Sequence, residues 1–228
     1  MKALYQRNSS MKAYSIRRIG AGYHESELTE KYSSASAIRH SLAKDSLSES
    51  IYRQLPFAAQ TIMKETFDMR YPVYANDFSL ILKYKLLQET KKSLTSYMDV
   101  SEDLANRIIN LRNDFQSFDG FCNTLKTKDM TYARISRGLL HILLDIRTEH
   151  LANYKKNGYC HYAHILGFRK SSAELLSLLK GTSKVPLLTK LTQTEDLSEA
   201  GCQMIHQDIF ASDLYESVIT DKFDTPFI

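Results

Sequence analysis

The segment TYARISRGLLHILLDIR, residues 131–147, constrains the fold of this chain more than any other. Its apolar residues recur at helical spacing, at Ile135, Leu139, Ile142, Leu143 and Ile146. Steps of three and four residues place these side chains on one side of an α-helix, which must pack against other elements. The segment therefore predicts a core helix within a helical domain.

Further helical patterns follow one another from about residue 45. Ser101 and Ser117 are suited to cap helices beginning in EDLANRIINLRNDF and FDGFCNTLKT, because a serine oxygen accepts a free helix N–H. Pro56 suits the first turn of a helix in PFAAQTIMKETF, and Asn76 or Asp77 can cap one in FSLILKYKLLQET. With only 8 Gly and 4 Pro in 228 residues, the composition also disfavours a turn-rich all-β fold.

The two ends of the chain predict mixed α/β parts. MKALYQRN reads as the end of a helix, and the weak alternation of MKAYSIRRI, residues 11–19, predicts a short strand. Near the C-terminus, YCHYAHILGF and KVPLLTKL predict strands on either side of a helix in SSAELLSLLKG, with Gly181 at its end. Pro186 favours an edge strand or a strand start. The predicted fold class is mainly α with α/β parts, ending in a small βαβ-like unit.

Bulk features restrict the function classes. No apolar run approaches the roughly 20 residues of a membrane helix, and the first residues lack a signal-peptide core, so we expect a cytoplasmic protein without membrane contact. Cys122, Cys160 and Cys202 have no metal-type spacing and are expected to be reduced thiols. His161 and His164 beside Cys160 suggest a metal site, but on a strand they would point to opposite faces. We therefore expect no bound metal there.

A glycine turn near the N-terminus is the first candidate site. In IRRIGAGYHE, residues 16–25, Arg17 and Arg18 precede Gly20–Gly22, and glycine lets a backbone approach a phosphate closely. The Ser-rich helix start that follows places Ser36 and Arg39 one turn apart, a spacing that can complete an anion cradle. The alternative for Gly20–Gly22 is a purely structural turn. The alternative for Ser36 and Arg39 is an ordinary N-cap with a surface arginine.

A basic face on the segment 131–147 is the second candidate. Residues 126–156 carry seven Lys or Arg against three acids, and residues 1–44 carry eight against three. On the predicted helix, Arg134, Arg137 and His141 lie opposite the apolar stripe, and Lys126 and Lys128 precede them. Such a row can follow a phosphate backbone, so nucleotide or RNA is the expected partner. The alternative is a solvated helix face.

Six sequence blocks together resemble the bacterial tRNA(Met) cytidine acetate ligases. They are SIRRIGAGYHE, SSASAIR, LILKYKLL, LANRI, TKDMTYARISRGLLHILL and HILGF, in this order over essentially the whole chain. The resemblance implies the end of a nucleotidyltransferase-like Rossmann domain, residues 1–44, followed by a mainly helical tRNA-binding domain with a C-terminal α/β segment, residues 45–228. It also implies ATP with Mg²⁺, acetate and elongator tRNA(Met) as reactants. The product would be 4-acetylcytidine at the wobble position, made through acetyl-adenylate.

The resemblance also implies site residues. Arg18, with Arg17 beside it, corresponds to the ATP site, and Ser36 and Arg39 correspond to contacts with nucleotide phosphates; no catalytic residue is assigned. The family's His-x-Gly-His motif, which grips ATP, does not occur in the sequence. We therefore expect this chain to be the C-terminal part of such an enzyme, unable to make acetyl-adenylate alone. The alternatives are a non-catalytic tRNA-binding module and a structural remnant.

Overall fold

The computed structural model describes residues 2–17, 19–22, 25–30, 32–45, 47–192 and 194–228. The chain divides into two compact units, Met1–Tyr71 and Pro72–Ile228, called here the N-terminal unit and the C-terminal unit. Each is considered by itself. That a nucleotidyltransferase-like domain ends at residue 44 stays a prediction.

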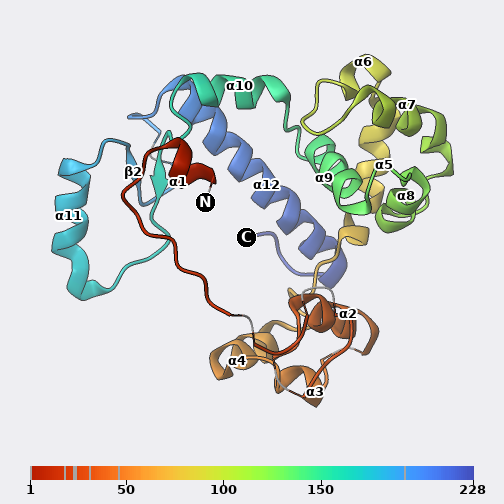
Figure 1. Cartoon of the computed structure of the whole chain (residues 1–228), viewed down its shortest axis with the longest axis horizontal. Coiled ribbons are helices and arrows are strands. Elements are labelled where there is room, and N and C mark those ends of the chain that lie inside the picture. Colours follow the sequence, from red (N-terminus) through yellow and green to blue (C-terminus); the bar gives the residue numbers. More distant parts are fainter. Residues whose placement is uncertain (1, 18, 23–24, 31, 46, 193) are drawn as a thin grey trace. The chain divides into compact units, whose positions relative to one another are not determined.

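The N-terminal unit contains short helices, drawn in red to orange in Figure 1. They are α1 (Lys2–Gln6), α2 (Ala35–Asp45), α3 (Glu49–Tyr52) and α4 (Phe57–Thr66). Ala37, Leu42 and Ile51 are buried between α2 and α3. The helices predicted in MKALYQRN and PFAAQTIMKETF are confirmed as α1 and α4. Pro56 lies at the N-cap position of α4, where its missing N–H costs no helical hydrogen bond.

The strand predicted for residues 11–19 is wrong for the described part of this segment. Residues 11–17 and 19 have no regular secondary structure, and the side chains of Tyr14 and Ile16 are 87% and 96% exposed. A strand is stabilised by backbone hydrogen bonds to a neighbouring strand and by burial of one face. Neither is provided here, so the alternation of side chains alone does not produce a strand.

The C-terminal unit holds a helical bundle and a small α/β part (Figure 1). Its elements are η1 (Ala75–Phe78), α5 (Ser79–Gln88), α6 (Lys91–Leu94), α7 (Glu102–Leu111), η2 (Arg112–Asp114), α8 (Phe118–Leu125), α9 (Tyr132–Leu143), α10 (Thr148–Lys156), β1 (Ala163–His164), η3 (Lys170–Ser172), α11 (Ala173–Thr182), β2 (Leu187–Leu188) and α12 (Glu199–Phe223). Figure 1 shows α5, α7, α8 and α9 gathered together. The mainly helical fold class is confirmed.

The bundle core follows the predicted apolar stripes. Leu82, Leu86, Leu104, Ile108, Ile135, Leu139 and Ile142 are fully buried in one cluster. Ser101 Oγ accepts the Leu104 N–H at 3.3 Å and Ser117 Oγ accepts the Gly120 N–H at 3.1 Å, so both predicted caps are confirmed. The predicted cap at Asn76 or Asp77 is wrong, because both residues lie inside the 3₁₀ turn η1, which leads directly into α5.

Gly138 lets α9 approach the start of α7 closely. A Cβ at this position would lie 3.3 Å from Leu104 Cδ2 and 3.5 Å from the Asp99 carbonyl oxygen. The first of these distances is tighter than most Cβ contacts and the second is an ordinary one, so a larger residue at this position would require the Leu104 side chain to shift by a few tenths of an ångström. This close approach brings the outer face of α9 next to Asp99.

The C-terminal α/β part confirms the predicted βαβ order. β1 and β2 pair in parallel, with Ala163 opposite Leu187 and His164 opposite Leu188, and α11 connects them. Pro186 directly precedes β2 as predicted, and its carbonyl accepts the Ala163 N–H at 2.9 Å. Gly181 is the next-to-last residue of α11, so its predicted place at the end of this helix is confirmed. Across the described residues, no helix has both the length and the apolar character to cross a membrane.

Candidate nucleotide and nucleic-acid sites

Hydrogen bonds of Glu25 and Ser34 connect the glycine turn to the start of α2. The Gly22 N–H donates to Glu25 Oε2 at 2.6 Å, and the Glu25 carbonyl accepts the Ser34 hydroxyl at 2.5 Å. Ser34 Oγ in turn accepts the Ala37 N–H at 3.0 Å and is the N-cap of α2. Gly20 has φ +88°, a conformation that glycine adopts without strain. A carboxylate therefore already occupies the N–H of Gly22.

The predicted phosphate ligands lie on the surface of the N-terminal unit. The side chains of Arg17, Ser36 and Arg39 are exposed, and none makes a hydrogen bond or ion pair with another described residue. Ser36 and Arg39 stand one turn apart on α2, as the sequence predicted. Arg18 lies outside the described residues. Arg17 and Arg39 are therefore exposed and accessible to an anion, but the described residues do not form a cavity around them.

The predicted basic face lies on α9 and the loop before it. Lys126, Lys128, Arg134 and Arg137 are exposed, and His141 is partly buried. Figure 1 shows α9, in green, between α5 and α12. Because these five residues belong to one rigid helix and its approach loop, their spacing is fixed within the unit. The arrangement suits contacts to several phosphates of one polyanion.

Asp99, which the sequence did not single out, pairs with two members of the basic face. Arg137 Nε lies 2.6 Å from Asp99 Oδ2, and His141 Nδ1 lies 3.4 Å from the same oxygen and 2.9 Å from the Met98 carbonyl oxygen. The hydrogen bond from Arg137 holds the pKa of the Asp99 carboxyl below its ordinary value. The side chains of Lys126, Lys128 and Arg134 have no such ion pair with another described residue. The sequence separation of 38 between Asp99 and Arg137 explains why no local pattern revealed the pair.

A buried polar network fixes the loop that carries Asp99. The Tyr97 hydroxyl donates to Glu89 Oε1 at 2.6 Å and accepts from Arg147 at 3.2 Å, while Arg147 also pairs with Asp145 at 2.9 Å. Backbone bonds from Met98 to Ile146 and from Thr148 to Ser96 run beside it. Burial and the Glu89 carboxylate together raise the pKa of Tyr97, so its hydroxyl stays protonated and keeps donating. The network thereby joins the 96–99 loop to the end of α9.

The cysteine–histidine group near β1 does not form a common cluster. His161 is buried, with Nδ1 3.4 Å from the Ser198 hydroxyl, whereas His164 is exposed on β1. No group of three or more His, Cys, Asp or Glu side chains is positioned to hold a metal ion in the part of the chain that the structure describes.

Burial raises the pKa of the Cys122 thiol to about 12, so this cysteine packs as an apolar residue.

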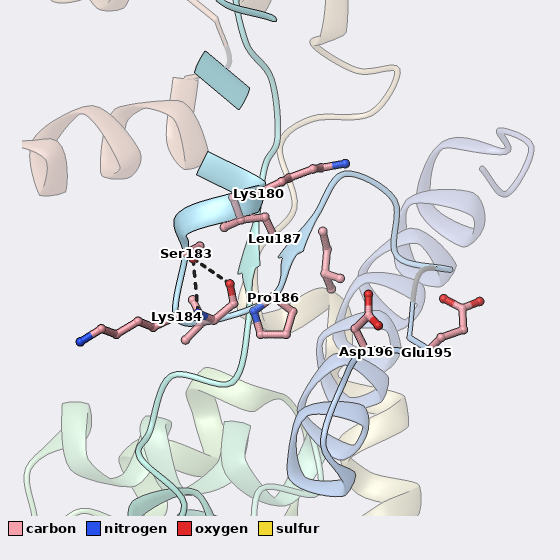
Figure 2. A pocket seen from close by; sticks show the side chains of 9 residues that line it. Lys180, Ser183, Lys184, Pro186, Leu187, Glu195 and Asp196 are labelled. Carbon is pink, nitrogen blue, oxygen red and sulfur yellow. Dashed lines mark hydrogen bonds between the residues drawn. The ribbon is translucent and has the colours of Figure 1, made fainter. Parts of the chain in front are cut away.

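A pocket of about 460 Å³ opens beside the start of β2. Its lining includes Lys180, Ser183, Lys184, Pro186, Leu187, Glu195 and Asp196. Ser183 closes a local turn by donating to the Val185 carbonyl at 2.8 Å. Figure 2 shows Lys184 and Lys180 pointing away from the neighbouring Asp196 and Glu195. Because these charged groups do not converge on one point, the pocket lacks the arrangement expected of a catalytic centre.

Comparison with known proteins shows to which family the chain belongs. The model of the HIGH nucleotidyl transferases matches residues 1–226. The chain belongs to the HIGH nucleotidyl transferase family. Within it, the tRNA(Met) cytidine acetate ligase of Alkaliphilus metalliredigens is 31% identical over 225 residues, covering 97% of this chain. The predicted resemblance to that group of nucleotidyl transferases is confirmed.

Two solved structures share the fold. Thermotoga maritima TmcAL in its apo form superposes with a TM-score of 0.82 over 95% of this chain at 24% identity. The same protein bound with alpha-thio ATP gives a TM-score of 0.78 over 99% of this chain at 23% identity. The chain spans about half of each protein it matches, namely 53% of the Alkaliphilus ligase and 53% and 56% of the two Thermotoga chains.

Proposed function

We propose that the chain is the tRNA-holding part of an ATP-dependent tRNA(Met) cytidine acetate ligase of the cytoplasm. The observation that carries this proposal is the match of nearly the whole chain to relatives of that name. The complete enzyme would use ATP, acetate and elongator tRNA(Met), without membrane contact, and give 4-acetylcytidine at the wobble position. The exposed basic face on α9 supports the part assigned to tRNA, because it offers fixed cations to a phosphate backbone.

The proposed chemistry has two steps. An acetate oxygen attacks the α-phosphorus of ATP and releases pyrophosphate; the cytosine amino group then attacks the acetyl carbon, AMP leaves, and the nitrogen loses a proton. Arg17, Arg18, Ser36 and Arg39 would serve the first step by stabilising the phosphates. Cations need no proton transfer for this role, and Mg²⁺ would accompany ATP as its phosphate-bound counterion. The second step depends on holding the cytosine in position.

The first test is acetate-dependent exchange of pyrophosphate into ATP. We expect no exchange by the 228-residue chain alone, because the sequence holds no His-x-Gly-His motif to grip ATP. The ligase from Alkaliphilus metalliredigens, assayed in parallel, serves as the positive control. Robust acetate-dependent exchange by this chain would contradict the prediction and place the whole ATP site within these residues.

A non-catalytic tRNA-binding module is the second candidate, favoured by the exposed arginines of α9 on a unit with its own hydrophobic core. A gel-shift assay with elongator tRNA(Met) across salt concentrations, with and without ATP, separates the two. A pure binding module would show a steep salt dependence and no response to ATP. A ligase part keeps Arg17 and Arg39, so ATP added in excess would change its tRNA affinity even without acetyl-adenylate formation, and this change would disappear in the Arg39→Ala variant.

Replacing Asp99 with Asn is expected to strengthen tRNA binding about threefold, because it releases Arg137 and His141 from a competing carboxylate. Asparagine tolerates the left-handed backbone at this position, φ +62°, so the loop should keep its shape. Since the pKa of Asp99 is lowered, its pair with Arg137 is intact at neutral pH and is lost only as the pH falls through that lowered value.

Filter binding with elongator tRNA(Met) at neutral pH measures the effect. The control is Asp103→Asn, which removes the same charge from an exposed position on α7 that pairs with no residue of the basic face. Equal affinities for the two variants would show that Arg137 and His141 do not face the tRNA.

A further inference from the structure

A second pocket, of about 370 Å³, lies where the end of α9 meets α10 and α12. Its walls are Leu144, Asp145, His150, Gln203, His206, Gln207 and Phe210, and it is called here the α9/α12 pocket. The size is within the range of sites for small molecules or single side groups. Phe210, on α12, is 46% exposed, so part of its ring is available for stacking.

The polar groups of this pocket differ in how far they are already engaged. Gln207 is fixed, because its Nε2 donates to the Asp145 carbonyl at 3.3 Å and its Oε1 accepts from Tyr154 at 3.4 Å. The side chains of Gln203 and His206 make no hydrogen bond with another described residue. His150 Nδ1 is buried without a partner among the described residues, and buried polar atoms normally have one. A free amide offers both a donor and an acceptor, as the edge of a nucleobase requires.

The basic face leads directly to this pocket. Arg137, His141 and Leu144 stand at i, i+4 and i+7, so they follow one stripe along α9 and its final turn. A strand whose phosphates lie along Arg134 and Arg137 would therefore reach the pocket wall at Leu144. Cations that track a backbone beside an exposed aromatic ring are the usual combination in single-stranded RNA binding.

We propose that the α9/α12 pocket receives one unpaired nucleobase of the bound tRNA, stacked on Phe210, with Gln203 reading its edge. This inference rests on the proposed function, and it adds a contact that distinguishes unpaired from paired RNA. Arg134 and Arg137 supply affinity that does not depend on sequence, whereas Phe210 and Gln203 act only on a base that has left its helix.

The experiment compares three RNA probes: elongator tRNA(Met), a single-stranded oligoribonucleotide of mixed sequence, and a fully paired RNA duplex of the same length. Dissociation constants are measured with the 228-residue chain and its variants at one salt concentration. Phe210→Ala is expected to weaken binding of tRNA and of the single strand about tenfold, and to leave duplex binding unchanged. Phe210→Trp, which keeps a stacking surface, should restore the affinity.

Phe227→Ala is the matched control, because it removes the same ring from a similarly exposed position outside the pocket. Equal weakening of all three probes, or no weakening by Phe210→Ala, would overturn the inference. In both of those cases, salt-dependent tRNA binding by the unmodified chain would leave the proposed function standing. A chain that binds no tRNA at all would overturn the proposed function and the pocket assignment together.

Discussion

Replacing Leu139 with alanine is expected to lower the free energy of unfolding of the C-terminal unit by about 3 kcal/mol. Leu139 is fully buried at the centre of the bundle core, where α9 packs against α5 and α8. Removing its isobutyl group leaves a cavity that the surrounding helices fill only in part. The loss therefore includes both the transfer free energy of the missing atoms and the contacts around the cavity.

Leu140 gives a control on the next residue of the same helix. Its side chain is 37% exposed, so Leu140→Ala makes the same chemical change with little cavity and should cost less than about 1 kcal/mol. Urea unfolding followed by far-ultraviolet circular dichroism measures both variants, since the chain has no tryptophan for fluorescence. Similar midpoints for Leu139→Ala and Leu140→Ala would contradict the assignment of α9 as a core helix.

The features of the helical bundle that the sequence predicted are those that depend on neighbouring residues in the chain. The stripe through Ile135 and Leu139 and the serine caps at Ser101 and Ser117 need only helical spacing and a local hydrogen bond. The pairing of β1 and β2 was predicted for a similar reason, because two short apolar segments flank a helix.

The features that were missed depend on contacts between distant segments. The predicted strand at residues 11–19 lacks the neighbour that would pair with it, and no local pattern reports that lack. Asp99 meets Arg137 where the loop before α7 packs against α9, and the α9/α12 pocket joins residues 144–150 with residues 203–210. The predicted site residues were therefore chosen from local sequence and stay predictions, whereas their surroundings depend on the fold.

Removing Arg134 and Arg137 together is expected to weaken tRNA binding at low salt between tenfold and a hundredfold, roughly 1.4 to 2.8 kcal/mol. The Arg134 side chain is exposed and makes no hydrogen bond or ion pair with another described residue, and Arg137 remains exposed despite its pair with Asp99. Binding by the variant would release fewer counterions from the tRNA, because it would make fewer phosphate contacts. The slope of log affinity against log salt should therefore become shallower by about 1 to 2. Measuring dissociation constants at several salt concentrations gives both quantities.

Lys91→Ala with Lys92→Ala is the matched control for this double variant. Both lysines are exposed on α6, and their loss changes the net charge by the same amount as the loss of the two arginines. If tRNA responded only to the overall positive charge, the two double variants would bind equally. A weaker affinity and a shallower slope for the arginine variant alone would locate the phosphate contacts on α9, because the two double variants lose the same charge at different places on the surface.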